Sequence, residues 1–235
     1  MRKDAMRLSI VMPVLNEADT IASALERLQE LRARGVEVIV ADGGSTDGTV
    51  GKALTLADVV LPAPRGRALQ MNAGAREAGG DALLFLHADT RLPENADALA
   101  LDALRASAWG RFDVQIEGRS AMLPVIAAMM NLRSRVTGIA TGDQAMFMTR
   151  EAFDAIGGFP EIALMEDIAA SKTLKRVGPP ACLRVKVTTS GRRWEKNGVW
   201  RTIMLMWRLR LAYFFGAKPE DLARRYGYRP REDDA

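Results

Sequence analysis

Short apolar runs alternate with helical segments through the first 90 residues, and this alternation constrains the fold more than any other feature. Four runs, at 8–14, 36–40, 58–61 and 81–86, have the length and near-continuous apolar character of buried strands. Helices between such strands imply right-handed crossovers and parallel pairing. The sequence therefore predicts an α/β fold with a mostly parallel central sheet flanked by helices.

Three polar clusters directly follow predicted strands. They occupy 13–17, where Pro13, Asn16 and Glu17 stand, then 42–49 and 87–89. Open α/β sheets bind their ligands outside the carboxyl ends of the strands. The clusters are therefore expected to share one ligand-binding edge.

The second cluster is a glycine-rich turn containing Asp42, Gly43, Ser45 and Asp47. Glycine lets the backbone approach a ligand closely, and a carboxylate can accept hydrogen bonds from a base or a ribose. A tight turn with Thr46 or Asp47 as a helix cap explains the same residues. Both interpretations stay open on this turn alone.

The third cluster, His87-Ala88-Asp89, indicates a divalent cation site. One oxygen of Asp89 could bind the ion, and diphosphate oxygens and water would complete its shell. His87, the single histidine, is expected to position a ligand rather than bind the metal. Mn²⁺ tolerates imidazole better than Mg²⁺ does, so a ligand role for His87 stays open.

Two further groups carry charge at predicted helix starts. Arg65 and Arg67 could bind phosphates. Glu166 and Asp167 could include a general base that takes a proton from an acceptor hydroxyl. Each group alone is explained equally well or better by ordinary structure, as solvated arginines or as an acidic first turn favoured by the helix dipole.

Taken together, Pro-Val-Leu-Asn-Glu at 13–17, Asp-Gly-Gly-Ser-Thr-Asp-Gly-Thr at 42–49, His-Ala-Asp at 87–89 and Glu-Asp at 166–167 resemble family 2 glycosyltransferases. The resemblance runs from about residue 8 to residue 194. It implies a glycosyltransferase-A fold and an inverting transfer of sugar from a nucleoside-diphosphate sugar, expected to be UDP-linked, to an acceptor hydroxyl. It also implies a divalent cation, Mn²⁺ or Mg²⁺, as cofactor.

The resemblance also implies roles for individual residues. Asp167 would be the catalytic base, Glu166 would orient the acceptor or the base, and Asp89 would bind the metal. His87 departs from the family's usual Asp-x-Asp pattern, which leaves the metal preference open. The implied donor-binding residues are Pro13, Asn16, Glu17, Asp42, Gly43, Ser45, Asp47, Arg65, Arg67, His87, Ala88, Asp89, Arg193 and Trp194.

Two strings in the sequence also resemble one subgroup of the family, and two other functions stay open. The strings at 66–72 and 142–145 resemble small glycosyltransferases associated with arsenosugar biosynthesis. A non-catalytic nucleotide-sugar-binding protein on the same fold is one alternative. A nucleotidyltransferase is the other, although it would need a triphosphate-binding loop where Asn16 and Glu17 stand.

The 235 residues are expected to form one catalytic domain, with a donor-binding half at 7–92, an acceptor and catalytic half at 93–195, and a helical segment at 196–229. The single cysteine, Cys182, excludes an internal disulfide framework. With no signal peptide recognisable at the start, a cytoplasmic location is expected.

The net charge is +4, and arginines are concentrated in the second half of the chain. No nucleic-acid module is recognisable. Phosphate-bearing substrates or an anionic membrane surface could explain the bias, and a solvated basic face explains it equally well. The apolar stretches 122–130 and 199–215 do not resemble membrane spans. They could lie on a membrane, with Trp200, Trp207 and Tyr213 at its interface, but core or homodimer-forming helices are favoured. The acceptor stays open between a small molecule, a glycan and a lipid-linked group.

Overall fold

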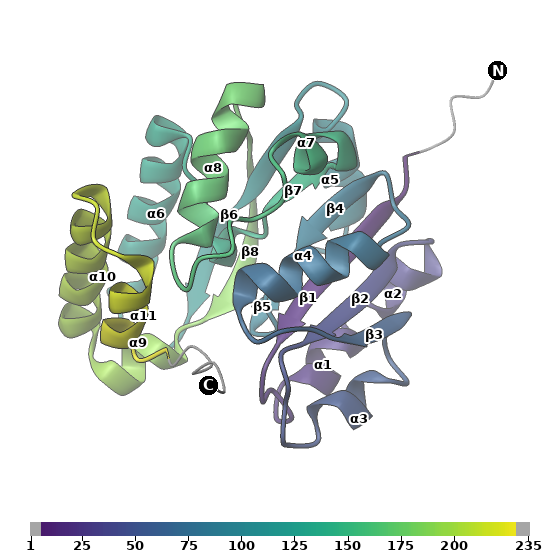
Figure 1. Cartoon of the computed structure of the whole chain (residues 1–235), viewed down its shortest axis with the longest axis horizontal. Coiled ribbons are helices and arrows are strands. Elements are labelled where there is room, and N and C mark those ends of the chain that lie inside the picture. Colours follow the sequence, from purple (N-terminus) through teal and green to yellow (C-terminus); the bar gives the residue numbers. More distant parts are fainter. Residues whose placement is uncertain (1–5, 229–235) are drawn as a thin grey trace.

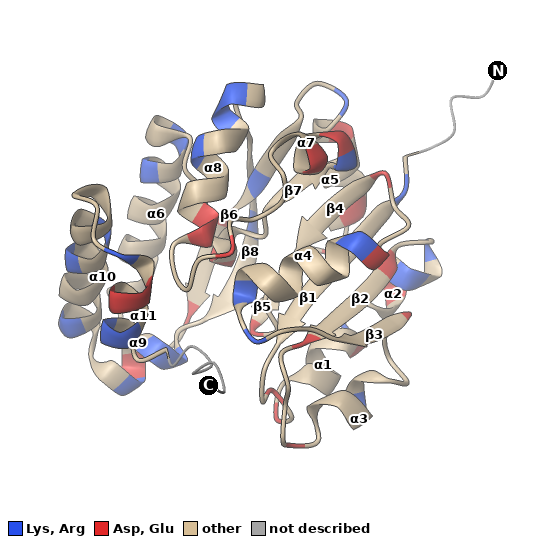
Figure 2. Cartoon of the chain, viewed as in Figure 1, with Lys and Arg blue, Asp and Glu red and all other residues tan. Residues whose placement is uncertain are grey.

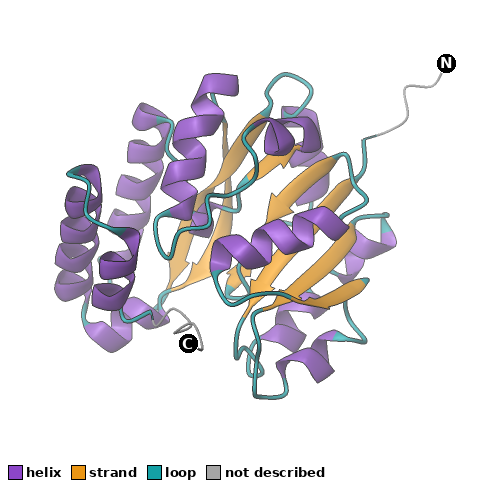
Figure 3. Cartoon of the chain, viewed as in Figure 1, coloured by secondary structure: helices purple, strands orange, loops and turns teal. Residues whose placement is uncertain are grey.

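The computed structural model describes residues 6–228. Over these residues, eight strands form one sheet with helices on both faces, an α/β arrangement (Figures 1 and 3). In order across the sheet, the strands are β3 (Val59–Pro62), β2 (Glu37–Asp42), β1 (Leu8–Val14), β4 (Ala82–Phe85), β7 (Phe147–Thr149), β6 (Trp109–Glu117), β8 (Ala181–Ser190) and β5 (Thr90–Arg91).

The sheet is mixed but mostly parallel. Strands β3, β2, β1 and β4 are parallel neighbours, and β6 is parallel to β8. The short strand β7 runs antiparallel to both β4 and β6, and β5 runs antiparallel to β8. Because β1, β2 and β4 are parallel, the loops that follow them lie at one edge of the sheet, as predicted.

Alternate residues of the strands face two separate cores. In β1, Ile10 and Met12 face one core, and Val11 faces the other. The first core is covered by α1 (Ile21–Glu26), α2 (Gln29–Ala33), α3 (Thr49–Ala53), α5 (Ala96–Ala103) and α6 (Leu123–Thr137). The second is covered by α4 (Arg67–Glu77), α7 (Arg150–Ala155) and α8 (Glu166–Val177).

The last three helices lie at the end of the molecule away from β3 (Figure 1). They are α9 (Arg192–Asn197), α10 (Val199–Phe214) and α11 (Pro219–Tyr226). Leu209 of α10 and Leu222 of α11 pack with Met165 and Ile168 in a third apolar cluster. Within residues 6–228, no helix has the length and apolar character needed to cross a bilayer.

Several predicted boundaries are corrected. The sequence predicts one helix from about residue 20 to a stop at Gly35, but a tight turn in which Leu28 N–H donates to Leu25 O divides it into α1 and α2. The apolar stretch 122–130 lies at the start of the 15-residue helix α6. Tyr213 does not lie on the outer face of α10, because its half-buried ring packs beneath Lys172.

Candidate active site

Hydrogen bonds join the loop after β1, residues 15–20, to the end of β2 and the loop that follows it, residues 42–49. We call these two segments together the rim. Asn16 adopts a left-handed conformation with φ of 54°. Its N–H donates to Ser45 Oγ at 2.8 Å, and its Oδ1 accepts from Thr46 N–H at 2.9 Å. Asp47 accepts from Ala18 N–H and Thr49 N–H, and the Thr49 hydroxyl holds the pKa of Asp47 below its ordinary value. The two predicted donor loops thus support each other.

The buried carboxylate of Asp42 is turned into its own loop. It accepts from the N–H groups of Gly44 and Ser45, and from the Ser45 hydroxyl. A carboxylate has about four acceptor positions, so roughly one remains for a ligand. The tight-turn interpretation therefore describes most of what Asp42 does here. The neighbouring Glu17 is half-buried and accepts from the Thr20 hydroxyl at 2.6 Å.

A second group of predicted residues gathers around one small cavity. Arg67 begins α4, His87 follows β4, and Glu166 and Asp167 begin α8. The remaining lining residues are Met71, Phe85, Gly142, Met146 and Phe159. The structure therefore brings together side chains, such as Arg67 and Glu166, that are 99 positions apart in the sequence.

Asp167 is held by backbone donors at the start of α8. Gly142 N–H donates to its Oδ2 at 2.9 Å, and Ile168 N–H donates to its Oδ1 at 2.7 Å. Burial raises the pKa of Asp167 to about 6, and the neighbouring Glu166 carboxylate adds to the increase. A carboxylate with this pKa is largely deprotonated at neutral pH, yet it is a stronger base than an ordinary aspartate.

Glu166 and Arg67 form an ion pair beside Asp167. The Glu166 side chain is buried, and Arg67 Nη1 lies 3.3 Å from its Oε1. Desolvation lowers the pKa of Arg67, but the charges of nearby carboxylates, Glu166 foremost, outweigh it and raise the pKa overall. The cluster thus keeps one fixed positive charge next to its carboxylates.

His87 is paired with Asp143, an aspartate that the sequence pattern does not single out. The Nδ1 atom of His87 lies 3.5 Å from Asp143 Oδ1. Burial opposes ionisation of Asp143, but His87, Arg67 and Arg193 stabilise the carboxylate and lower its pKa. Gly142 lies against the imidazole so closely that an added Cβ would come 2.4 Å from His87 Cε1. In the sequence, residues 142–145 contribute only to the resemblance to arsenosugar-associated transferases. Their distance from His87 along the chain does not predict this contact.

Asp89 is exposed, and its carboxylate accepts only from the Thr90 hydroxyl, at 3.3 Å, among residues 6–228. No group of three or more His, Cys, Asp or Glu side chains converges on one point in that part of the chain. These residues therefore do not form a closed protein cage for a metal. They fit an open site in which Asp89 supplies one oxygen and a bound diphosphate supplies others.

The predicted donor-binding residues Arg193 and Trp194 lie in two different environments. Arg193 is exposed, stacks over the Tyr226 ring at 3.6 Å, and donates to Tyr226 O at 3.2 Å. Burial raises the pKa of Tyr226, and the positive charges of Arg193 and Arg67 partly oppose this increase. Tyr226 of α11 is thus a site neighbour that sequence reasoning missed. Trp194 packs against the first core, and the exposed Arg65 makes no side-chain hydrogen bond or ion pair within the described residues.

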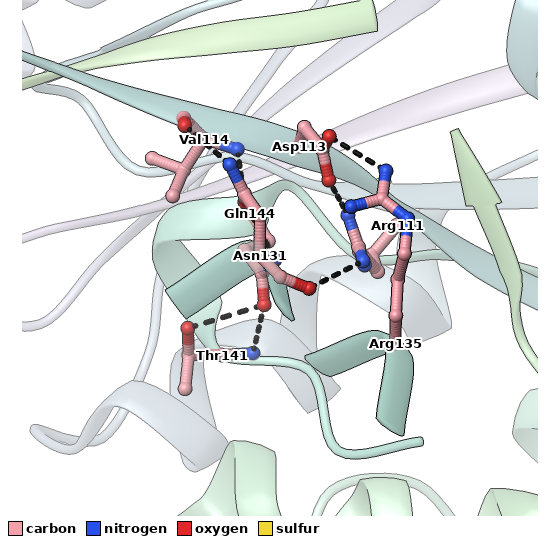
Figure 4. Close-up of polar contacts among 7 residues, drawn as sticks. All are labelled: Arg111, Asp113, Val114, Asn131, Arg135, Thr141 and Gln144. Carbon is pink, nitrogen blue, oxygen red and sulfur yellow. Dashed lines mark hydrogen bonds and ion pairs between the residues drawn. The ribbon is translucent and has the colours of Figure 1, made fainter. Parts of the chain in front are cut away.

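A buried polar network supports the segment that holds Asp167 (Figure 4). Asn131 of α6 bonds both backbone groups of Val114 in β6, at 2.8 and 2.9 Å. Gln144 accepts from Thr141 N–H, which fixes the turn Gly142–Gln144. Arg111 and Arg135 both pair with Asp113. A cavity of about 510 Å³ beside α6 and β6 is lined by parts of this network and by none of the predicted site residues.

Comparison with known proteins decides the family. The model of glycosyl transferase family 2 matches residues 9–155, more than half of the chain. The chain belongs to glycosyl transferase family 2. The matched range includes the strand-end clusters of this family 2 chain but ends before Glu166 and Asp167, so it does not test the role of the α8 carboxylates.

A curated relative of the family 2 chain is succinoglycan biosynthesis protein ExoA of Rhizobium meliloti (strain 1021). The two are 32% identical over 173 residues, which cover 65% of this chain and 52% of ExoA. The chain thus spans about half the length of that relative.

Solved structures of other proteins share the fold predicted for a family 2 member. Mannosyltransferase PcManGT from Pyrobaculum calidifontis, in complex with GDP-Man and Mn²⁺, has a TM-score of 0.64 at 21% identity, covering 89% of this chain and 62% of that one. TarS (1–349) from S. aureus with UDP has a TM-score of 0.63 at 19% identity, covering 79% and 60%. The predicted α/β, glycosyltransferase-A-like fold is confirmed.

Proposed function

We propose that this chain is a catalytically active, inverting glycosyltransferase that moves a sugar from a nucleoside-diphosphate sugar to an acceptor hydroxyl. The observation that carries the proposal is Asp167. It is fixed by two backbone N–H groups, has a pKa raised to about 6, and lies with Arg67 and His87 around one cavity. A non-catalytic binding protein would have no need for a carboxylate with these properties.

In the proposed reaction, Asp167 removes the proton from the acceptor hydroxyl. The acceptor oxygen forms a bond to the anomeric carbon while the bond from that carbon to the diphosphate oxygen breaks. The diphosphate leaves with the bonding electron pair, and the configuration inverts because attack and departure occur on opposite faces. Glu166 keeps Arg67 in place beside the base. A cation bound by Asp89 would supply charge for the leaving diphosphate.

We propose a UDP-linked donor and Mn²⁺ or Mg²⁺ as the cation. TarS was solved with UDP, whereas PcManGT was solved with GDP-Man and Mn²⁺, so similar folds accommodate both bases. The nucleoside would bind along the rim formed by the loops after β1 and β2, within the proposed donor half of the domain. The resemblance to arsenosugar-associated transferases stays a prediction about the subgroup.

Donor binding can be tested without knowing the acceptor. We expect UDP-sugars with Mn²⁺ to raise the melting temperature, because a ligand that binds only the folded state stabilises it by mass action. Asp89→Ala should remove the metal-dependent part of this stabilisation. Asp154→Ala is a matched control, since Asp154 is an exposed aspartate in α7, outside the loops after β1 and β2, and its side chain makes no hydrogen bond or ion pair within residues 6–228.

Slow release of UDP from the donor, with water as acceptor, provides the activity measurement. We expect Asp167→Asn to abolish this release while the shift in melting temperature persists. Folded protein that responds to no nucleoside diphosphate, with or without metal, would contradict the proposal. A response to GDP-sugars alone would keep the transferase and reject the UDP preference.

A further inference from the structure

The outer face of α10 is an apolar stripe. Five large side chains recur at intervals of three or four residues along this helix, and each is between 59% and 76% exposed: Trp200, Met204, Trp207, Leu211 and Phe214. The opposite face, with Thr202 and Leu209, is buried against the protein. The helix is therefore already packed on one side, and the α10 stripe contributes nothing to that packing.

A second stripe of the same kind lies on α6. Val125, Met129, Leu132 and Val136 follow the same spacing and are between 48% and 77% exposed. Both helices belong to the end of the molecule away from β3 (Figure 1). Scattered exposed apolar residues are ordinary, but aligned rows on two helices at one end of a protein are typical of an interaction surface.

The charges beside the α10 stripe are all positive. At about 100° per residue, Arg201 and Arg208 fall on one side of the stripe and Arg210 on the other. Their side chains make no ion pair or hydrogen bond in the part of the chain that the structure describes. No acidic residue occurs between Lys196 and Lys218, nor within α6. Figure 2 accordingly shows blue and no red on these two helices.

We propose that the α10 stripe and its flanking arginines bind the surface of a bilayer that contains anionic lipids. Tryptophan and phenylalanine would enter the boundary between headgroups and acyl chains, and the arginines would contact lipid phosphates. A second copy of the chain fits this surface less well. A two-fold contact would place the same arginines against one another with no acidic partner on either helix.

This surface lies close to the catalytic residues. The buried face of α10 packs with Met165 and Ile168, which flank Glu166 and Asp167 in sequence. A helix with its side chains is about 10 Å across. Binding through α10 would therefore hold the start of α8 roughly one helix diameter from the lipid headgroups.

Flotation of the full chain with vesicles tests the proposal directly. We expect binding to vesicles of phosphatidylcholine mixed with phosphatidylglycerol, and weaker binding as salt screens the charges. Replacing both tryptophans, Trp200→Gln with Trp207→Gln, should reduce the partition coefficient about tenfold or more. Arg201→Gln and Arg208→Gln should each reduce it by roughly fivefold.

Matched controls separate this surface from general stickiness. Leu54, at the end of α3, is 61% exposed, so Leu54→Gln removes an equally exposed apolar side chain elsewhere. Arg105→Gln removes an exposed arginine outside the surface. Both control variants should bind vesicles as the wild type does. Equal loss in the controls, no binding to either vesicle, or equal binding to phosphatidylcholine alone would overturn the proposal.

Sedimentation without lipid provides the remaining outcome. A dimer that the two tryptophan substitutions dissociate, in protein that does not float with vesicles, would assign the stripe to self-association and reject the bilayer. Failure here leaves the proposed transferase function untouched, because donor binding is measured in the absence of lipid.

Discussion

The rim after β1 and β2 differs from the group around Asp167 in how its polar side chains are held. In the rim, Asn16, Asp42 and Asp47 mostly bond backbone N–H groups of the two loops themselves. Around Asp167, ionisable side chains from α4, α8 and the loop after β4 face one cavity. The rim is thus a local structure, whereas the group around Asp167 exists only once the whole sheet has formed.

The two regions also contain carboxylates whose pKa values shift in opposite directions, Asp47 in the rim and Asp167 at the start of α8. In Asp47, hydrogen bonds lower the pKa and stabilise the charge, which suits a structural role. In Asp167, burial and a like charge raise the pKa, which costs stability but suits the proposed role as a base. Substitution of Asp167 should therefore mainly reduce activity, whereas substitution in the rim should mainly reduce stability.

The largest expected effect follows from removing the proposed base, Asp167. Asp167→Asn keeps the shape of the side chain but cannot accept the acceptor's proton, so we expect turnover to fall by about a thousandfold or more. Donor affinity should change little, because donor binding is proposed for the rim. Single-turnover kinetics together with calorimetry of donor binding would check both statements. Parallel loss of turnover and donor binding would reject the base role.

The same substitution should reveal the stability cost of the base. The pKa of Asp167 is about 6 in the folded protein, against 3.8 for an ordinary aspartate. The folded state therefore binds more protons between these values, and stability is lost as the pH rises through that window. Relative to Asp167→Asn, the wild type should lose about 2–3 kcal/mol of unfolding free energy across it, at roughly 1.4 kcal/mol per pKa unit.

Urea unfolding of both proteins across this pH range measures the difference. Asp154→Asn is the control, because it makes the same substitution at an exposed aspartate in α7 whose side chain makes no ion pair or hydrogen bond within residues 6–228. If the unfolding free energies of the wild type and Asp167→Asn depend on pH in the same way, burial does not raise the pKa of Asp167.

The difference between the two regions also explains what the sequence could predict. The rim and Asp89 follow strands directly, so the apolar periodicity is enough to predict that they lie at one edge of the sheet. The sequence also predicts a helix that starts at Glu166, and the structure has α8 at Glu166–Val177. Such features depend on short-range pattern, which a single sequence contains.

The remaining site residues depend on long-range packing. Nothing near Asp143 in sequence indicates that it pairs with His87, and Tyr226 reaches the site only because α11 folds back beside α10. The division of 20–35 into two helices is also not predictable, because one tight turn at Leu28 leaves the apolar spacing unchanged. Contacts of this kind are set by how the sheet and its helices assemble.

A smaller effect is expected at the contact between Gly142 and His87. Gly142→Ala would place a methyl group 2.4 Å from His87 Cε1, so the ring or the turn must move. The N–H that fixes Asp167 belongs to the same residue, and we expect turnover to fall about tenfold, in line with lost positioning. Gly51→Ala in α3 is the matched control, because an added Cβ there meets nothing within 4 Å. Equal activity in both variants would contradict the positioning role.

The smallest effect should come from the rim, where Asn16 combines a left-handed backbone with a hydrogen bond to Thr46. Asn16→Gly removes the hydrogen bond but keeps the backbone conformation accessible, so we expect a loss of about 1 kcal/mol of unfolding free energy. Asn16→Ala adds the strain of a left-handed alanine and should cost about 1 kcal/mol more. Asn95→Ala, at an exposed position whose side chain makes no capping hydrogen bond, should change stability by less than about 0.5 kcal/mol. Because the nucleoside is proposed to bind along the rim, the two Asn16 variants should bind the donor more weakly. Turnover per folded molecule at saturating donor should nevertheless stay near the wild-type value in all three variants, because the structural losses are local. A large loss of turnover at saturating donor in Asn16→Gly would show instead that the rim and the group around Asp167 are coupled.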